Sequence, residues 1–278
     1  MFLKTEIAKG VSLHIRQTAQ FKTVNFSIKW RAPLNEETAA ERTVLSNVLQ
    51  HSNEKFPTAA SYRSYLDDLF GTVLYFDTTK RGQEHTVLLN VETVNDQYLS
   101  HGNVLNEVIS LLQEAIFKPN FENGVFKEAI VKREKEMVIQ RIQSIFDDKS
   151  RYAQKRLTEI MRPNSAASIS ANGTIETVKA ITPQSLTKTY EEMIANDVID
   201  IYVVGDINIE EMTEQLKAAF PFADRNVPQA TKEDVTSVKV EPYTKETQEM
   251  KQGKLHIGYS TPVRFGDADF PKMQIFNG

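Results

Sequence analysis

Histidine is the residue type in this sequence best suited to metal or acid–base chemistry, because the chain contains no cysteine. The five histidines are His14, His51, His85, His101 and His256. A protein zinc site needs at least three side chains brought together, usually with two from one closely spaced motif. His51 and Glu54 come nearest to such a motif, since residues three apart share a helix face, but Lys55 follows and an ammonium cannot ligate. We keep His51 and Glu54 as a minority metal hypothesis beside that of an ordinary surface helix end.

Other residue patterns that carry chemistry are missing from the sequence. It has no Gly-x-Ser-x-Gly elbow, no phosphate-binding loop and no dinucleotide fingerprint. Adjacent carboxylates occur at Asp67-Asp68 and Asp147-Asp148, but neighbouring residues on a helix point about 100° apart and do not share a site. We therefore expect no bound cofactor, with zinc required only under the minority hypothesis.

Composition narrows the classes of protein and partner. The 278 residues include 33 basic and 37 acidic side chains, so the sequence has no excess of positive charge that would favour binding to nucleic acid. Hydrophobic residues make up 40% and charged residues 25%, which is in the globular range. No apolar run approaches the ~18 residues of a membrane span, and the first residues do not follow the pattern of a secretory leader. We expect a cytoplasmic protein with neither nucleic-acid nor membrane partners.

Hydrophobic periodicity predicts a mixture of strands and helices. Apolar residues alternate with polar ones over 11–15 and 24–30, which predicts two strands that open the chain as a hairpin-like pair. The same criteria predict helices over 39–50, 62–70 and 104–117 and strands over 73–76 and 87–91. Charges of alternating sign over 123–161 are typical of a solvated helix surface.

The second half of the chain is predicted to contain the end of one domain, a connector and the start of a second, similar domain. Thr182-Pro183 predicts a helix start, 199–204 a buried strand, and Asn208 with Glu211 a second capped helix. Residues 224–252 are polar and charged, as in a connector. We expect a first α+β domain over 1–223, the connector over 224–252, and the opening of a similar copy over 253–278. The sequence stops where that copy's first helix would grow, which suggests a piece of a longer protein.

Two stretches carry a resemblance to a known family. Asn172-Gly173-Thr174, Ile181-Thr182 and the run from Ile201 to Ile207, which includes Val-Val-Gly-Asp, are similar in type and spacing to the pitrilysin (insulinase) family of inverted zinc peptidases. The stretch from Ala32-Pro33 to Gly71 is similar to that family's first strand exit, active-site helix and second helix. The likeness covers essentially the whole chain. It implies a two-layer α+β domain in which helices cover an antiparallel-rich sheet.

The resemblance also implies where a zinc site would lie. Family members hold zinc with H-x-x-E-H on the first helix and a glutamate on a later helix. Counted back from Gly71, these motif positions fall on Thr43, Ser46 and Asn47. The helper glutamate falls on Glu134, and the distal ligand position falls on Arg141. A guanidinium stays protonated and repels a dication, so the resemblance implies a peptidase homologue that has lost its metal site.

The family further implies a binding mode and a partner. Its members add peptides as a strand at a sheet edge, which corresponds here to Val73, Leu74, Tyr75, Phe76 and Asp77. Catalytically degenerate bacterial members are paired with an active paralogue. The chain looks most like the inactive member of the pair associated with elongation factor P modification. We therefore expect a peptide-binding or scaffolding subunit, with an active zinc peptidase at a shifted His51 and Glu54 as the alternative.

Overall fold

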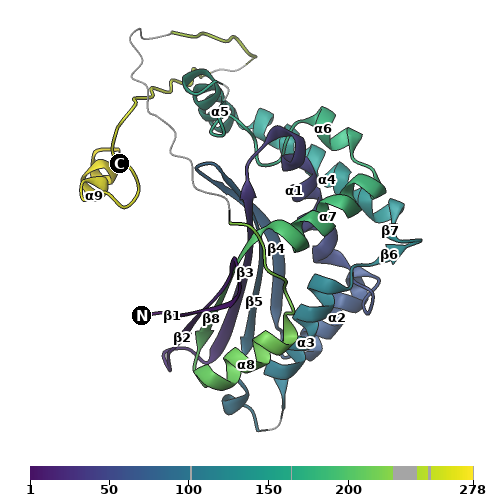
Figure 1. Ribbon diagram of the computed structural model, residues 1–278. Helices are drawn as coiled ribbons and strands as arrows, with labels where there is room; N and C mark the ends of the chain where they lie inside the picture. Colours follow the sequence, from purple (N-terminus) through teal and green to yellow (C-terminus); the bar gives the residue numbers. More distant parts are fainter. Residues whose placement is uncertain (101, 164, 228–242, 250–251, 278) are drawn as a thin grey trace.

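A six-stranded sheet forms the centre of the molecule (Figure 1). The computed structural model describes residues 1–100, 102–163, 165–227, 243–249 and 252–277. The strand order is β1-β2-β8-β3-β5-β4; β2 and β8 run parallel, and the other neighbours run antiparallel. The strands are β1 (Leu3–Ala8), β2 (Val11–Gln17), β3 (Thr23–Pro33), β4 (Val73–Arg81), β5 (Glu84–Val94) and β8 (Val198–Gly205), while β6 (Phe121–Glu122) and β7 (Val125–Phe126) form a separate hairpin.

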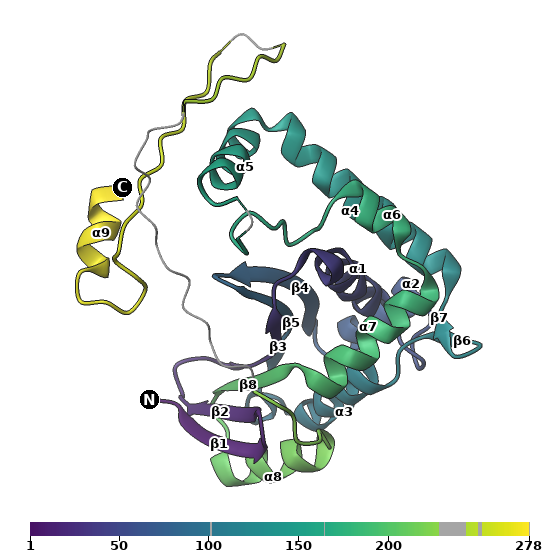
Figure 2. The same cartoon turned by 45° about the horizontal axis from the view of Figure 1, so that its top comes forward.

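Most of the helices form a second layer on one face of the sheet, whereas α9 lies away from it (Figures 1 and 2). The helices are α1 (Glu36–His51), α2 (Ala59–Asp68), α3 (Val104–Phe117), α4 (Glu128–Asp147), α5 (Lys149–Met161), α6 (Ile175–Ala180), α7 (Pro183–Asn196), α8 (Ile209–Ala219) and α9 (Phe270–Asn277), with a short 3₁₀ turn at Asp96–Tyr98. Contact with the sheet is made by α1 on β4 and β5, α3 on β5, α7 on β3 and α8 on β2. The predicted two-layer α+β architecture is therefore confirmed.

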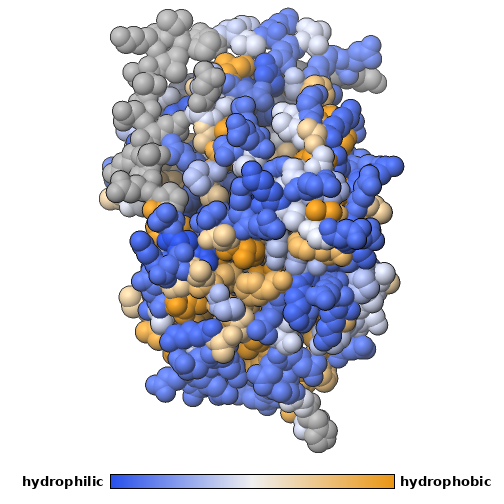
Figure 3. Space-filling model, turned by 45° about the vertical axis from the view of Figure 1, so that its right-hand side comes forward, coloured by the Kyte–Doolittle hydropathy of each residue, from blue (hydrophilic) through white to orange (hydrophobic). Residues whose placement is uncertain are grey.

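Alternation along the strands builds the core between these layers. Val24, Phe26, Ile28 and Trp30 of β3 are each no more than 1% exposed, whereas the residues between them are half-buried on the other face. That other face is polar: Arg31 donates hydrogen bonds to Asp200 of β8 and Glu84 of β5, each at 2.8 Å. The helical side of the molecule presents mainly hydrophilic residues to solvent, with an apolar area near its middle (Figure 3).

The opening strands are not paired as the hairpin we expected. β8 lies between β2 and β3, parallel to the first and antiparallel to the second. Its residues Ile199, Ile201 and Val203 are fully buried, as a central position requires. The alternating patterns of β2 and β3 show only that each strand buries one face. They carry no information about which strand lies beside them, so the hairpin prediction was wrong.

Two helices, α4 and α5, make up most of the charged stretch over 123–161. Asp148 ends α4 and begins α5, and its carboxylate accepts hydrogen bonds from the N–H groups of Ser150 and Arg151. Most of α4 is solvated, as predicted, but Val131, Glu134 and Val138 are buried against the domain. A buried glutamate was not expected in a stretch interpreted as solvent-facing.

The last described residues extend away from the sheet and end in α9 (Figure 1). Part of the predicted connector, at 228–242 and 250–251, lies outside the described residues. The alternating residues Leu255, Ile257 and Tyr259 are 76%, 65% and 76% exposed, and no strand forms there. Between them, His256 contacts Gln154 of α5 at 3.1 Å. Among the helices of the described ranges, none is long and apolar enough to cross a membrane.

Candidate functional site

The face of α1 that turns toward β4 and α4 carries Thr43, Ser46 and Asn47, the residues to which the family resemblance assigns the H-x-x-E-H motif. α1 begins after Asn35, whose side chain accepts a hydrogen bond from the Thr38 N–H, and buried alanine, valine and leucine residues anchor the helix to the sheet. Thr43 and Ser46 are buried at 0% and 1% exposure, and Asn47 is half-buried. The local helix therefore places these three side chains together, as their spacing predicts.

The hydroxyl groups of this face are engaged in hydrogen bonds within the protein. Thr43 Oγ1 donates to the carbonyl of Ala171 at 2.7 Å and lies 3.2 Å from Oγ1 of Thr78 on β4. Ser46 Oγ donates to the carbonyl of Thr43 at 2.9 Å. Since a hydroxyl has a single proton, the Thr43 proton is committed to Ala171, and the Thr78 hydroxyl is the donor in the contact between the threonines.

α4 brings a positive charge to the same place. Arg141 Nη2 lies 3.5 Å from Oδ1 of Asn47, a long contact between residues on α4 and α1. Two turns earlier on α4, Glu134 is 2% exposed, and its carboxylate pairs with Arg133 at 2.6 Å. The structure thus brings Asn47 and Arg141 together, while the charge of Glu134 is balanced by its neighbour.

The pair of the minority metal hypothesis does not share a helix face. α1 ends at His51 with Ser52 as its C-cap, and the exposed Glu54 lies in the following loop, where its N–H donates to the Lys118 carbonyl at 2.9 Å. The expectation of a common face for His51 and Glu54 was therefore wrong. Burial is the main influence on His51 and lowers its pKa, although Glu134 opposes the shift.

The other histidines do not converge on a metal site. His14 pairs with Asp200 at 3.0 Å on the polar sheet face, and His85 is fully buried on β5. His101 lies outside the described residues. Within the part of the chain that the structure describes, no three histidine, aspartate or glutamate side chains form a group that could hold a metal ion.

The predicted peptide-binding edge divides between the core and solvent. Leu74 and Phe76, on the face of β4 that turns to the core, are 6% and 7% exposed. Val73 and Tyr75, on the opposite face, are 56% and 42% exposed. β4 is the outer strand of the sheet, so one of its edges has no neighbouring strand among the residues that the structure describes. The Phe76 N–H on that side donates to Gln50 Oε1 of α1 at 2.5 Å. Sequence reasoning missed Gln50, although its position seven residues after Thr43 places it on the same helix face.

A buried ion pair beside this face was also missed. Arg42, next to Thr43, is 4% exposed; its Nη2 lies 2.6 Å from the carboxylate of Asp197 and also donates to the carbonyls of Trp30 and His85. Burial is the main influence on Asp197 and raises its pKa, against the opposing effect of Arg42. Alternation in β5 could have identified His85 as a core residue, but no local signal joins Arg42 to Asp197.

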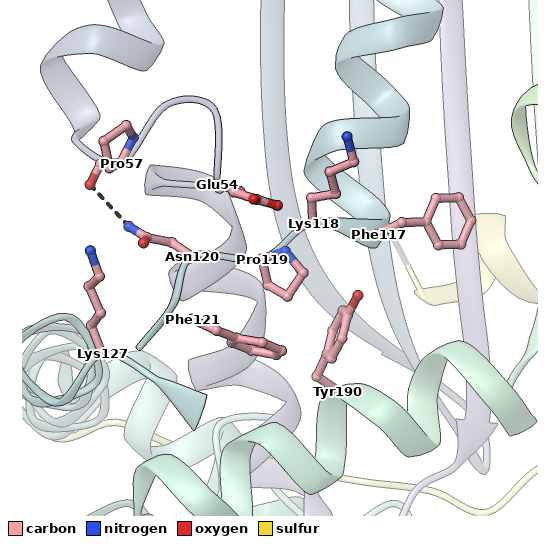
Figure 4. Close-up of a pocket in the computed structure, with 9 residues that line it drawn as sticks. All are labelled: Glu54, Pro57, Phe117, Lys118, Pro119, Asn120, Phe121, Lys127 and Tyr190. Atoms are coloured by element: carbon pink, nitrogen blue, oxygen red, sulfur yellow. Dashed lines mark hydrogen bonds between the residues drawn. The ribbon is translucent and has the colours of Figure 1, made fainter. Parts of the chain in front are cut away.

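A pocket of about 460 Å³ lies where the α1–α2 loop meets α7 and the end of α3 (Figure 4). It is lined by Glu54, Pro57, Phe117, Lys118, Pro119, Asn120, Phe121, Lys127 and Tyr190. The rings of Phe121 and Tyr190 meet edge to face, and Asn120 Nδ2 donates to the Pro57 carbonyl at 3.1 Å. Burial raises the pKa of Tyr190, whose hydroxyl donates to the Ile116 carbonyl. Its phenol therefore has a structural role. Thr43, Ser46, Asn47 and Arg141 are not among the residues that line this pocket.

Comparisons with known proteins agree with this arrangement. Residues 180–278 match the family model described as "Peptidase M16 inactive domain". A Bacillus subtilis (strain 168) protein named "Probable inactive metalloprotease YmfF" is 36% identical over 271 residues, which are 97% of this chain and 63% of that protein. The chain therefore spans less than two thirds of the length of this relative.

Solved structures show the same fold. A conserved protein from Enterococcus faecalis V583 superposes with a TM-score of 0.79 at 32% identity, over 83% of this chain and 54% of that one. A structure described as the peptidase M16 inactive domain from Pseudomonas fluorescens superposes with a TM-score of 0.65 at 12% identity, over 82% of this chain and 53% of that one. The sequence match and the fold agree: the chain is a homologue of the M16 (pitrilysin) metallopeptidases, and the family model and the Bacillus subtilis relative that it matches are both described as inactive.

Proposed function

We propose that this protein is a pseudopeptidase, which supplies part of the wall of a substrate chamber to an active M16 paralogue and does not cleave peptides itself. The observation that carries the proposal is the contact of Arg141 with Asn47, beside a Thr43 hydroxyl that is bonded to the Ala171 carbonyl. Four positions that would supply two imidazoles and two carboxylates offer instead two hydroxyls, an amide and a guanidinium. Such a set provides neither ligands for zinc nor a base to activate water.

A scaffolding role is supported by what the chain retains. The fold superposes on the M16 inactive domain from Pseudomonas fluorescens with a TM-score of 0.65, and α1 packs against β4 in this chain. We propose that 1–223 forms one domain of the chamber wall and that 253–278 is the start of a second, similar domain. Residues 224–252 connect the two. The exposed Leu255, Ile257 and Tyr259 support this division, because an alternating apolar face is typical of a strand that packs in a sheet.

The partner hypothesis is tested by co-expression of the full-length protein with the active M16 paralogue from the same cell. An enclosing interface of this kind should bury on the order of 2,000 Å² and survive size-exclusion chromatography. We expect co-elution, together with peptide cleavage that depends on both chains. Separate elution at micromolar concentration, with full cleavage by the paralogue alone, would contradict the scaffolding role.

The finer assignment concerns elongation factor P modification, to which the sequence resemblance points. The measurement is the modification state of elongation factor P in cells with and without this protein, by mass spectrometry of the purified factor. Loss of modification on deletion, restored by the wild-type gene, is the expected result. Unchanged modification would remove this assignment and leave the pseudopeptidase proposal in place.

The alternative, a zinc peptidase that uses His51 and Glu54, has less support. The two residues lie on either side of the end of α1. Burial lowers the pKa of His51, and Arg133 and Arg63 add to this shift against the opposing effect of Glu134. Cationic neighbours also disfavour a dication. Zinc that is lost on His51→Ala but retained on Thr43→Ala would favour this alternative.

A further inference from the structure

Side chains of the protein itself accept hydrogen bonds from the outer edge of β4, the edge that faces away from β5. Successive residues of a strand direct their N–H groups to opposite sides, so the N–H groups of Phe76 and Thr78 leave the same edge, away from β5. The first donates to Gln50 Oε1 at 2.5 Å, and the second donates to Asp77 Oδ1 at 2.8 Å. These are donors that an added strand would use.

Side-chain contacts extend this closure along the strand. The Thr78 hydroxyl contacts Thr43 at 3.2 Å, and Lys80 Nζ donates to the carbonyls of Ala167 at 2.8 Å and Ile169 at 2.6 Å. Phe76, Thr78 and Lys80 are alternate residues of β4. They are joined to α1 at Gln50 and Thr43, which lie two helical turns apart, and to the segment that precedes α6. We refer to the contacts of Gln50, Thr43 and Lys80 with their partners as the latch.

Each contact of the latch joins groups that the fold already holds together. A peptide that adds to β4 must displace Gln50 from the Phe76 N–H, and an intramolecular acceptor competes at a high effective concentration. Edge strands that are covered or blocked in this way are protected from pairing with other chains. The latch therefore raises the free energy of strand addition without changing the fold.

We propose that the latch is an autoinhibitory contact that keeps the β4 edge closed to extended peptides, and that Gln50 is its gating residue. The proposal goes beyond the scaffolding role and does not depend on the paralogue, because it concerns the isolated chain. It predicts that the wild-type protein binds extended peptides weakly at the β4 edge. Removal of the Gln50 acceptor should expose this edge and strengthen peptide binding.

The test compares the wild type with two replacements of Gln50. Gln50→Leu keeps a similar volume but cannot accept a hydrogen bond, whereas Gln50→Glu keeps an acceptor at the same reach. The probe is a fluorescein-labelled peptide of about eight residues that alternates threonine and valine, long enough to form a strand. Binding is measured by fluorescence anisotropy, and protection of the Phe76 amide is measured by hydrogen exchange.

We expect Gln50→Leu to bind the peptide about tenfold more tightly than the wild type and to lose protection at Phe76. Gln50→Glu should behave as the wild type in both measurements. Gln50→Ala, which also lacks the acceptor, serves as the second open variant if Gln50→Leu does not fold. The latch is refuted if the wild type already binds as tightly as the open variants, or if neither open variant gains affinity while Phe76 loses protection.

This result is independent of the heteromer experiment. A wild type that binds peptide tightly would remove the latch but leave a scaffold with a binding edge. Failure to associate with the paralogue would remove the scaffolding role but leave the effect of Gln50 on peptide binding unchanged. The two proposals therefore fail under different observations.

Discussion

Arg141 Nη2 on α4 lies 3.5 Å from the side-chain oxygen of Asn47 on α1, although the two residues are 94 positions apart in the sequence. The family resemblance assigns a glutamate and a histidine to these two positions. An amide oxygen beside a guanidinium is a compatible pair of neutral acceptor and charged donor. A cation between the two side chains would be repelled, because the guanidinium of Arg141 carries a positive charge.

The first prediction concerns zinc. The wild-type chain should hold no stoichiometric zinc after dialysis, and Thr43→His, Ser46→Glu and Asn47→His together should still hold none, because Arg141 remains. Adding Arg141→Glu completes the ligand set and should give stoichiometric zinc without peptide cleavage. Elemental analysis of the purified variants makes the comparison. Tight zinc in the three-site variant would show that the distal position has been placed on the wrong residue.

The buried ion pair of Arg42 and Asp197 should be a major determinant of stability. Arg42→Met leaves the Asp197 carboxylate buried without its partner at 2.6 Å, which should cost about 3–5 kcal/mol of unfolding free energy. Urea denaturation followed by circular dichroism measures the loss. The matched control is Arg151→Met, which removes an exposed arginine 3.3 Å from Asp148 and should cost less than about 1 kcal/mol. Equal losses in the two variants would contradict the argument.

His85 should make the protein sensitive to mild acid. Burial, with help from Arg42 and Lys80, lowers the pKa of His85 to about 4, and neither ring nitrogen has a hydrogen-bond partner. Between about pH 6.5 and pH 4 the unfolded chain takes up a proton at this histidine and the folded chain does not. Stability should therefore fall as the pH falls through this window, by up to about 3 kcal/mol from this residue.

The contribution of His85 to the pH dependence of stability is measured by comparing a His85 variant with the wild type. His85→Leu should flatten the decline in unfolding free energy between pH 6.5 and pH 4, measured by denaturant titration at several pH values. His256→Leu leaves the buried histidine in place and should keep the wild-type decline. An unchanged pH dependence in His85→Leu would mean that this histidine is accessible to protons in the folded state.

Gly173 should not tolerate a side chain. Its φ is +69°, and a Cβ there would lie 2.6 Å from Ala40 Cβ and 3.1 Å from Ala40 Cα on α1. Gly173→Ala should therefore cost about 2 kcal/mol or more in unfolding free energy, from backbone strain and from displacement of α1. Gly82→Ala is the control, because its φ is +57° with nothing within 4 Å of the added Cβ. Equal melting temperatures for the two variants would show that α1 adjusts freely.

Local features of this protein were readable from the sequence because the chain's own geometry imposes them. The alternation of Val24 to Trp30 follows from the two-residue repeat of a strand. The helix start at Thr182-Pro183 and the cap at Asn208 involve groups three residues apart, and both caps form as predicted. The proposed loss of the zinc motif also rests on the sequence, since it depends only on which residue types occupy the positions that the family resemblance assigns to the motif.

Tertiary structure alone decided the features that join distant parts of the chain. The insertion of β8 between β2 and β3, the contact of Gln50 with the Phe76 N–H and the pairing of Arg42 with Asp197 link residues 26 to 188 positions apart. Periodicity tells which face of an element is buried but not what it is buried against. Those choices depend on the packing of the helical layer against the sheet. Asp197, for example, lies 155 residues from Arg42 and becomes its neighbour only when the core has formed.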